Sequence, residues 1–203
     1  MTQAGKVDGR RVRSLRTRNA ILDALMDLVE DGILAPTAQQ IATRAGVSIR
    51  SVYQHFTDAE GLFSEALVRI LARTRELAVV IDPTWPLARR IEVLVDERGA
   101  VFEMITPFSR AALGLEAQHP AIEDGRRRLS NLALEEVGHV FGPELGQLDE
   151  PHRGELLRAL DASSAWMTWN HLRFGGCSVE QAKRVVRRSL SLLLSGPGVA
   201  PVP

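Results

Sequence analysis

Apolar residues recur at helical spacing along most of the chain, and glycines and capping residues divide this pattern into segments. In the first segment, residues 16–30, Ile21, Leu25 and Leu28 share one face of the expected helix. Gly32 follows this segment and provides a C-terminal stop. The pattern therefore predicts an amphipathic helix near the N-terminus.

Three more helices are predicted directly after the first one. A capping box at Thr37 opens a short helix, and Gly46 ends it because glycine adopts positive φ without steric cost. Ser48 caps a second short helix, and a further capping box, Thr57 with Glu60, opens a long one. Two short helices separated by a glycine are thus expected between two longer helices.

The rest of the chain is also predicted to be helical. A proline-rich stretch, residues 82–86, interrupts the chain after the fourth helix, and no alternation typical of strands occurs. The tail, residues 196–203, has three prolines and two glycines and is predicted to be disordered. The further helical segments expected are residues 87–103, 109–118, 122–141, 151–174 and 179–195. The prediction for the whole chain is an all-α fold.

The composition is that of a globular protein with a buried core. The 203 residues are 45% hydrophobic and 25% charged, which excludes global disorder and suffices for one or two domains. No apolar run approaches the length of a membrane span, and no apolar region follows the basic N-terminus as in a secretory signal. The single cysteine, Cys177, excludes an internal disulfide, and we expect a cytoplasmic protein.

Charge is balanced over the whole chain but not locally. Lys plus Arg and Asp plus Glu number 25 each, so the net charge of zero argues against a protein that coats nucleic acid by bulk charge. Residues 9–57 nevertheless carry seven Arg and four acids, and all four acids lie within residues 23–31. Residues 9–22 and 32–57 therefore lack carboxylates, as a nucleic-acid face requires. Chance clustering beside a disordered basic tail is the alternative.

Residues 37–56 have the pattern of a helix-turn-helix. This motif needs two short helices, a tight turn that often contains glycine, and a small buried residue where the helices approach closely. Ala42 is the small residue and Gly46 forms the turn, while the apolar contacts are Ile41, Val47 and Val52. A helical hairpin inside an ordinary bundle would show the same local pattern.

The outer side chains of the second short helix suit DNA. Arg pairs with guanine, Gln with adenine and Ser with either base, and helix N-termini hold phosphates. Arg50, Ser51, Gln54 and His55 form this outer side. Thr37 lies at a helix N-terminus, and Tyr53 is expected to reach a phosphate with its hydroxyl while its ring packs inside.

Residues 16–65 resemble the N-terminal domain of the TetR (tetracycline repressor) family. The resemblance rests on an Arg-led first helix (residues 18–32), the turn Ala45-Gly-Val-Ser48 and the closing segment Tyr53-Gln-His-Phe56. It implies a three-helix DNA-binding domain, a connecting fourth helix and a helical C-terminal domain that binds a small molecule and dimerises. By position, it assigns DNA contacts to Thr37, Ser48, Arg50, Ser51, Tyr53, Gln54 and His55.

Two positions depart from the family pattern. Ala59 stands where a lysine commonly contacts phosphate, and Arg50 stands where a small residue is usual. Our hypothesis is that arginines of an N-terminal arm compensate by reaching the DNA backbone or the minor groove, namely Arg10, Arg11 and Arg13. The predicted domains are a flexible basic arm (1–14), the DNA-binding domain (15–58), the connecting helix with the C-terminal domain (59–195) and the tail (196–203).

The C-terminal domain offers candidates for a ligand pocket and a dimer interface. Because pockets are mostly apolar with a few placed polar groups, the candidates are Met104, Phe108, Trp166, Trp169, Asn170 and Phe174, with Glu116 and His119 as further polar groups. In proteins similar to this one, the last two helices pair with those of a second copy. The same residues also suit a plain monomer core, which is the alternative.

The predicted function is a homodimeric, ligand-responsive transcriptional regulator, a repressor that a small molecule releases from a palindromic operator in double-stranded DNA. We expect no cofactor, metal site, catalytic activity or membrane partner, because the histidines are scattered and no phosphate-binding glycine loop occurs. A small helical enzyme or ligand carrier with an architectural helix-turn-helix is one alternative. An adaptor that has lost DNA binding is another.

Overall fold

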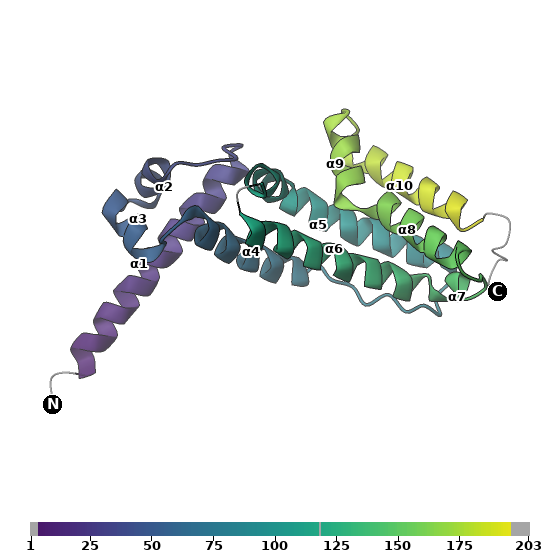
Figure 1. Cartoon of the computed structure of the whole chain (residues 1–203), viewed down its shortest axis with the longest axis horizontal. Coiled ribbons are helices and arrows are strands. Elements are labelled where there is room, and N and C mark those ends of the chain that lie inside the picture. Colours follow the sequence, from purple (N-terminus) through teal and green to yellow (C-terminus); the bar gives the residue numbers. More distant parts are fainter. Residues whose placement is uncertain (1–3, 118, 196–203) are drawn as a thin grey trace. The chain divides into compact units, whose positions relative to one another are not determined.

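The structure is a computed structural model that describes residues 4–117 and 119–195. These residues form helices and no strand, so the prediction of an all-α protein is confirmed (Figure 1). None of the described helices is long and apolar enough to cross a membrane. The tail predicted to be disordered, residues 196–203, lies outside the described residues. The helices are α1 (Ala4–Glu30), α2 (Ala38–Ala45), α3 (Ile49–His55), α4 (Ala59–Arg75), α5 (Leu87–Leu115), α6 (Pro120–Val140), α7 (Gly142–Leu145), α8 (His152–Ser164), α9 (Trp166–Phe174) and α10 (Val179–Leu193).

The chain divides into two compact units. The first unit contains Met1–Arg73 and Pro107–Asp124, and the second contains Thr74–Thr106 and Gly125–Pro203. The first unit thus includes α1, α2, α3, nearly all of α4 and the adjoining ends of α5 and α6. It contains the predicted DNA-binding domain, residues 15–58, together with most of the connecting helix.

Helix α1 starts at Ala4, well before the predicted start at residue 16. The residues expected to form a flexible arm, up to residue 14, are therefore helical from Ala4 onward. No proline interrupts this stretch, and extending an existing helix needs no new nucleation. The second half of α1 supplies that existing helix, because Ile21, Leu25 and Val29 are completely buried.

Local capping signals set the ends of the two short helices. Thr37 Oγ1 accepts a hydrogen bond from the Gln40 backbone N–H (3.2 Å), and the Gln40 side chain accepts one from the Thr37 N–H (2.9 Å). Gly46 has φ = 66°, in the left-handed region, and ends α2 there. Ser48 Oγ accepts from the Ser51 N–H (3.2 Å) at the start of α3. These three predicted signals are confirmed.

The start of α4 differs from the prediction. The capping box expected between Thr57 and Glu60 does not form. Asp58 directly precedes the first residue of α4, and its Oδ1 accepts from the Gly61 N–H (2.8 Å) instead. A carboxylate in the N-cap position satisfies this N–H directly, so the hydroxyl one residue earlier is not used.

Two further helix boundaries also differ from the prediction. Helix α5 continues through Pro107, where the pattern predicted a break. The single helix predicted for residues 151–174 is divided, because Ala165 is extended (φ −77°, ψ 156°) between α8 and α9. At this break the buried Arg98 guanidinium donates to the Ser164 carbonyl (2.9 Å). The arginine thus satisfies a carbonyl group that the break leaves without a helical partner.

The helices of the second unit pack around one apolar core. Figure 1 shows α5, α6, α8 and α10 running in roughly the same direction, with α9 turned away from them. The side chains that fill the core come from all of these helices and from the turn before α7. Those with at most 2% exposure include Leu94, Val137, Phe141, Leu160, Trp169, Ala182 and Leu190.

One ion pair is completely buried in the second unit. Arg90 on α5 and Glu144 on α7 are each 1% exposed, and the guanidinium donates two hydrogen bonds to the carboxylate (2.6 and 2.8 Å). Arg90 also donates to the Val140 carbonyl (2.6 Å) and to the Trp85 carbonyl (2.8 Å). All three nitrogens of the guanidinium therefore have partners, which a buried charge requires.

We expect Arg90→Ala to destabilise the protein by about 3–5 kcal/mol, because it leaves the Glu144 carboxylate buried without a counter-charge. The double variant Arg90→Leu with Glu144→Leu removes both charges and should recover most of this loss. Urea unfolding followed by circular dichroism measures both values. A loss in Arg90→Ala below about 1 kcal/mol, the usual value for a surface pair, would contradict this account.

Candidate nucleic-acid interface

Helices α2 and α3 pack against α1 through a few buried side chains. Ile41 and Ala42 of α2 are 4% and 1% exposed, and Val52 of α3 is 4% exposed. Figure 1 shows both short helices beside α1, joined by the tight turn at Gly46. The small Ala42 side chain allows the close approach that a helix-turn-helix requires. The core predicted for this motif is therefore observed.

The opposite side of α3 is polar and exposed. Arg50, Tyr53 and Gln54 recur at i, i+3 and i+4 and so share one face, and Tyr53 is 61% exposed. Within the described part of the chain, none of these three side chains has a hydrogen-bond partner. Polar groups that the protein leaves unpaired on one helix face are available to base edges and phosphates.

The other predicted contacts lie at the ends of α2 and α3. Thr37 and Ser48 are exposed N-cap residues, and Ser51 and His55 are half-buried on α3. The Thr37 hydroxyl is already engaged, because it donates to the Gln40 side-chain oxygen (2.9 Å). At this end of α2, the backbone N–H groups of the first turn are therefore better placed for a phosphate than the hydroxyl.

Arg18 of α1 holds the end of α3 in place. Its guanidinium donates to the His55 carbonyl (2.8 Å) and stacks on the Phe56 ring, 4.4 Å from the ring centroid. It also donates to both carboxylate oxygens of Glu65 on α4, to one of them at 3.2 Å. Sequence reasoning missed this role, because Arg18 is one of five arginines in an acid-free stretch and only long-range contacts distinguish it.

Ion pairs neutralise most of the acids at the end of α1. The pairs are Asp23 with Arg69 (2.6 Å), Glu30 with Arg73 (3.7 Å) and Asp31 with Arg44 (2.7 Å). Arg44 lies in a carboxylate-free stretch of the sequence, yet Asp31 balances its charge in the structure. Arg50 has no such acidic partner among the described residues. The exposed face of α3 therefore has an uncompensated positive charge.

Three further arginines are exposed on the N-terminal half of α1. Arg10, Arg11 and Arg13 have no ion-pair partner in the part of the chain that the structure describes. Arg10 and Arg13 are three residues apart in the helix, so they lie on one side of it. Ala59, the first residue of α4, is exposed and offers no side-chain donor.

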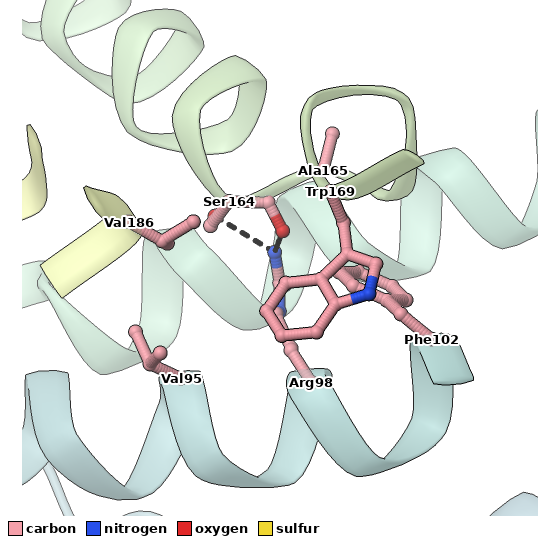
Figure 2. A pocket seen from close by; sticks show the side chains of 7 residues that line it. All are labelled: Val95, Arg98, Phe102, Ser164, Ala165, Trp169 and Val186. Atoms are coloured by element: carbon pink, nitrogen blue, oxygen red, sulfur yellow. Dashed lines mark hydrogen bonds between the residues drawn. The ribbon is translucent and has the colours of Figure 1, made fainter. Parts of the chain in front are cut away.

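The second unit contains a small cavity beside the break between α8 and α9. Its volume is about 10 Å³, which is room for one water molecule. Figure 2 shows the Trp169 indole beside Phe102, with Arg98 reaching Ser164 behind it. The lining residues are Val95, Arg98, Phe102, Ser164, Ala165, Trp169 and Val186. Of the six predicted ligand residues, Trp169 alone is among them.

The structure does not bring the other predicted ligand residues to this cavity. Phe108 is buried in the first unit, and Phe174 is 84% exposed at the end of α9. Met104, Trp166 and Asn170 are half-buried in the second unit. The two polar candidates Glu116 and His119 belong to the first unit.

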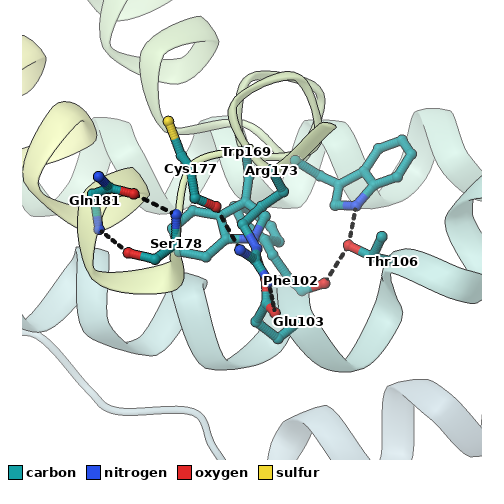
Figure 3. A network of polar contacts seen from close by, with 9 residues as sticks. Phe102, Glu103, Thr106, Trp169, Arg173, Cys177, Ser178 and Gln181 are labelled. Carbon is teal, nitrogen blue, oxygen red and sulfur yellow. Dashed lines mark hydrogen bonds and ion pairs between the residues drawn. The ribbon is translucent and has the colours of Figure 1, made fainter. Parts of the chain in front are cut away.

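A polar network holds Trp169 in place (Figure 3). The indole N–H donates to Glu103 Oε1 (2.8 Å), and Arg173 pairs with the same carboxylate (2.9 Å). Arg173 also donates to the Cys177 carbonyl in the turn before α10 (2.5 Å). These hydrogen bonds link α5, α9 and the start of α10, so a ligand that moves Trp169 must rearrange them.

A carboxylate beside Arg98 is incompletely satisfied. Glu97 Oε2 is buried without a hydrogen-bond partner among the described residues, although the carboxylate accepts from the Val79 backbone N–H. Burial raises the pKa of the Glu97 carboxyl, and the nearby charge of Glu136 raises this pKa further. The hydrogen bond from Val79 and the charge of Arg98 lower the pKa but do not offset the rise.

We expect Glu97→Gln to stabilise the protein at neutral pH. A carboxyl with a raised pKa holds its proton more tightly in the folded state, so the wild type loses stability as pH rises from 4.5 through the raised value. Glutamine cannot ionise, so its advantage should be full at about pH 7 and should vanish at about pH 4. Thermal unfolding at both pH values measures it, and an equal difference from wild type at the two would contradict this cause.

Comparison with known proteins places this architecture. Residues 21–66 match the model of a family described as bacterial regulatory proteins, tetR family. No curated protein matches the chain. A transcriptional regulator from a Rhodococcus species is 19% identical with a TM-score of 0.67, and the match covers 93% of this chain and 99% of that one.

Two TetR-family transcriptional regulators of known structure are also similar. The one from Mesorhizobium loti is 20% identical with a TM-score of 0.57, and the match covers 90% of this chain and 97% of that one. The one from Marinobacter aquaeolei is 16% identical with a TM-score of 0.66, and 91% of each chain is covered. At these identities the structural likeness shows a shared fold.

A helix-turn-helix with an exposed, unpaired polar face on its second helix defines a DNA-binding regulator. The match over residues 21–66 makes the assignment specific: the chain belongs to the TetR family of bacterial regulatory proteins. It is a DNA-binding transcriptional regulator and not an enzyme.

Proposed function

We propose that this regulator is a homodimeric repressor that binds a palindromic operator and leaves it when a small molecule binds to the second unit. The observation that carries the DNA-binding part is the exposed face of α3, where Arg50, Tyr53 and Gln54 have no partner among the described residues. The proposed partner is chromosomal DNA, so the proposed place of action is the bacterial cytoplasm.

The side chains on α3 divide the work between bases and phosphates. Arg50 donates to guanine and Gln54 pairs with adenine in the major groove, while Ser51 and His55 contact neighbouring edges. The Tyr53 hydroxyl binds phosphate, as do Ser48 and Thr37 with the free N–H groups of the first turn of α2. Arg50 thereby adds a base contact at a position where the family usually has a small residue.

The arginines of α1 supply the phosphate charge that Ala59 lacks. Arg10, Arg11 and Arg13 are exposed and without ion-pair partners in the described chain, which leaves their charges available to the DNA backbone or minor groove. The helical form of this segment supports the proposal, because a helix holds the three guanidinium groups at a fixed spacing.

Release by a ligand requires two conformations that the ligand distinguishes. By linkage, a small molecule that favours the conformation with low operator affinity also binds more weakly when the operator is bound. The proposed effector contacts are Met104, Phe108, Trp166, Trp169, Asn170 and Phe174. Trp169 has the strongest support, because it lines the cavity beside Arg98 and Ser164.

Dimerisation through the last two predicted helical segments, now α8–α9 and α10, is supported by apolar side chains that the single chain leaves exposed. On α10, Val185 is 41% and Leu192 is 62% exposed, opposite the buried Ala182, Val186 and Leu190. On α9, Met167 is 57% exposed. Apolar surface of this kind is typical of interfaces, and a two-fold dimer would place its recognition helices about 34–36 Å apart, one turn of DNA.

We expect Arg50→Ala and Gln54→Ala to relax base preference at single operator positions, because each removes about 1–3 kcal/mol of discrimination against a wrong base. Tyr53→Phe should instead weaken binding to all sequences alike. Mobility shifts on the DNA upstream of the regulator's own gene, at two salt concentrations, measure both effects. The control is Arg128→Ala, which removes an exposed arginine from α6. Unchanged selectivity in Arg50→Ala and Gln54→Ala would remove both residues from base readout.

Leu192→Glu should weaken dimerisation, because it puts a charge into the apolar surface of α10. We expect the dimer dissociation constant to rise about tenfold or more, as for a central interface residue. Sedimentation equilibrium measures it. The matched control is Val68→Glu on α4, since Val68 is 66% exposed outside the proposed interface. Equal dissociation constants for Leu192→Glu and Val68→Glu would rule out this surface.

A further inference from the structure

The turn between α5 and α6 lies against the start of α4. His119 in this turn has its Nδ1 3.3 Å from Oε2 of Glu60, which is in the first turn of α4. Both residues belong to the first unit, although most of α5 and α6 belongs to the second. Two long helices thus end inside the first unit, at a polar contact with the helix that follows the recognition helix.

Helix α4 carries this contact toward α1. Leu62 and Ala66 of α4 are 4% and 1% exposed, so the helix between Glu60 and Glu65 is anchored in the core of the first unit. Glu65 lies little more than one turn after Glu60 and pairs with Arg18. A helical segment of this length acts as a rigid element, so a displacement at Glu60 reaches Glu65.

Arg18 then carries the displacement to α3. The same guanidinium that binds Glu65 donates to the carbonyl of His55, the last residue of α3, and stacks on Phe56, which caps it. Phe56 is 5% exposed and its N–H donates to the Val52 carbonyl (2.9 Å), the last helical bond of α3. A shift of Arg18 therefore changes the C-terminal end of the helix that presents Arg50 and Gln54.

The far end of α4 is tied to α1. Arg69 donates to Asp23 (2.6 Å) and to Asn19 (2.6 Å), and Arg73 pairs with Glu30 (3.7 Å). These contacts hold the second half of α4 in a fixed register on α1. A displacement applied at the first turn therefore tilts the N-terminal end of α4, where Glu60 and Glu65 lie.

We propose that His119, Glu60, Glu65 and Arg18 form a contact path through which the turn between α5 and α6 sets the position of the C-terminal end of α3. The path rests on the proposed effector response and gives it a route to the DNA-reading helix. His119–Glu60 is the link that opens, because it is one contact between groups that are 23% and 37% exposed, whereas Arg18 has several partners.

The test is hydrogen exchange of the full-length protein, without DNA or ligand, followed by mass spectrometry of peptides from α3 and α4. The variants are His119→Ala, Glu60→Gln and the double variant. Each single substitution should speed exchange of the last α3 amides, residues 52–56, by about 2- to 30-fold, which corresponds to the usual range of coupling energies. The double variant should show no further increase, because both substitutions break the same link.

His152→Ala is the matched control. His152 pairs with Asp149 (3.0 Å) in the second unit, so this variant also removes a histidine from a contact with a carboxylate. It should leave exchange in α3 unchanged. Arg18→Lys, which retains the charge but not the fork of donors, should speed exchange of residues 52–56 even in the His119→Ala background.

The path is refuted if His119→Ala changes exchange only in residues 107–124, or if the effects of His119→Ala and Glu60→Gln on α3 add. Because no ligand is used, these outcomes do not depend on whether a small molecule is found to release the operator. An effector that releases DNA while both variants leave α3 unchanged would overturn the path and leave the proposed function standing.

Discussion

Helices of eight and seven residues are too short to persist alone in water, so α2 and α3 depend on the apolar face of α1. Ile21, Leu22, Leu25 and Val29 of α1 are completely buried and provide that face. Whatever α3 presents to DNA is therefore positioned by packing on its hidden side. Since α4 is tied to the same helix by Arg18 and Arg69, α1 is the common support on which the DNA-reading and the signal-carrying elements both rest.

Features set by neighbouring residues could be predicted from the sequence, and those set by distant residues could not. The caps at Thr37 and Ser48 and the turn at Gly46 depend on side chains within three residues, and all are observed. The division at Ala165 depends on Arg98, some 66 positions away, which binds the freed carbonyl of Ser164. No local pattern around residue 165 carries that information. The continuation of α5 through Pro107 was likewise hidden by a local breaking signal.

The same distinction separates the two candidate sites. The DNA-facing residues lie within one short segment, so helical periodicity alone placed Arg50, Tyr53 and Gln54 on one exposed face. A ligand site is assembled from several helices, and residue type says little about which side chains meet. Accordingly, Trp169 lines the cavity while Phe174, equally aromatic, is exposed. Charge follows the same rule, since Arg44 is balanced by Asp31 from another helix.

The cavity beside Trp169 has a consequence for sensitivity to a small molecule. A volume of about 10 Å³ is far below the roughly 300 Å³ of an ordinary ligand pocket, so an effector at this place must first separate side chains that are in contact. The apparent dissociation constant is then the intrinsic one divided by the fraction of molecules already open. The tightness of the core around Trp169 would thus act as a threshold, setting the concentration below which the regulator ignores its signal.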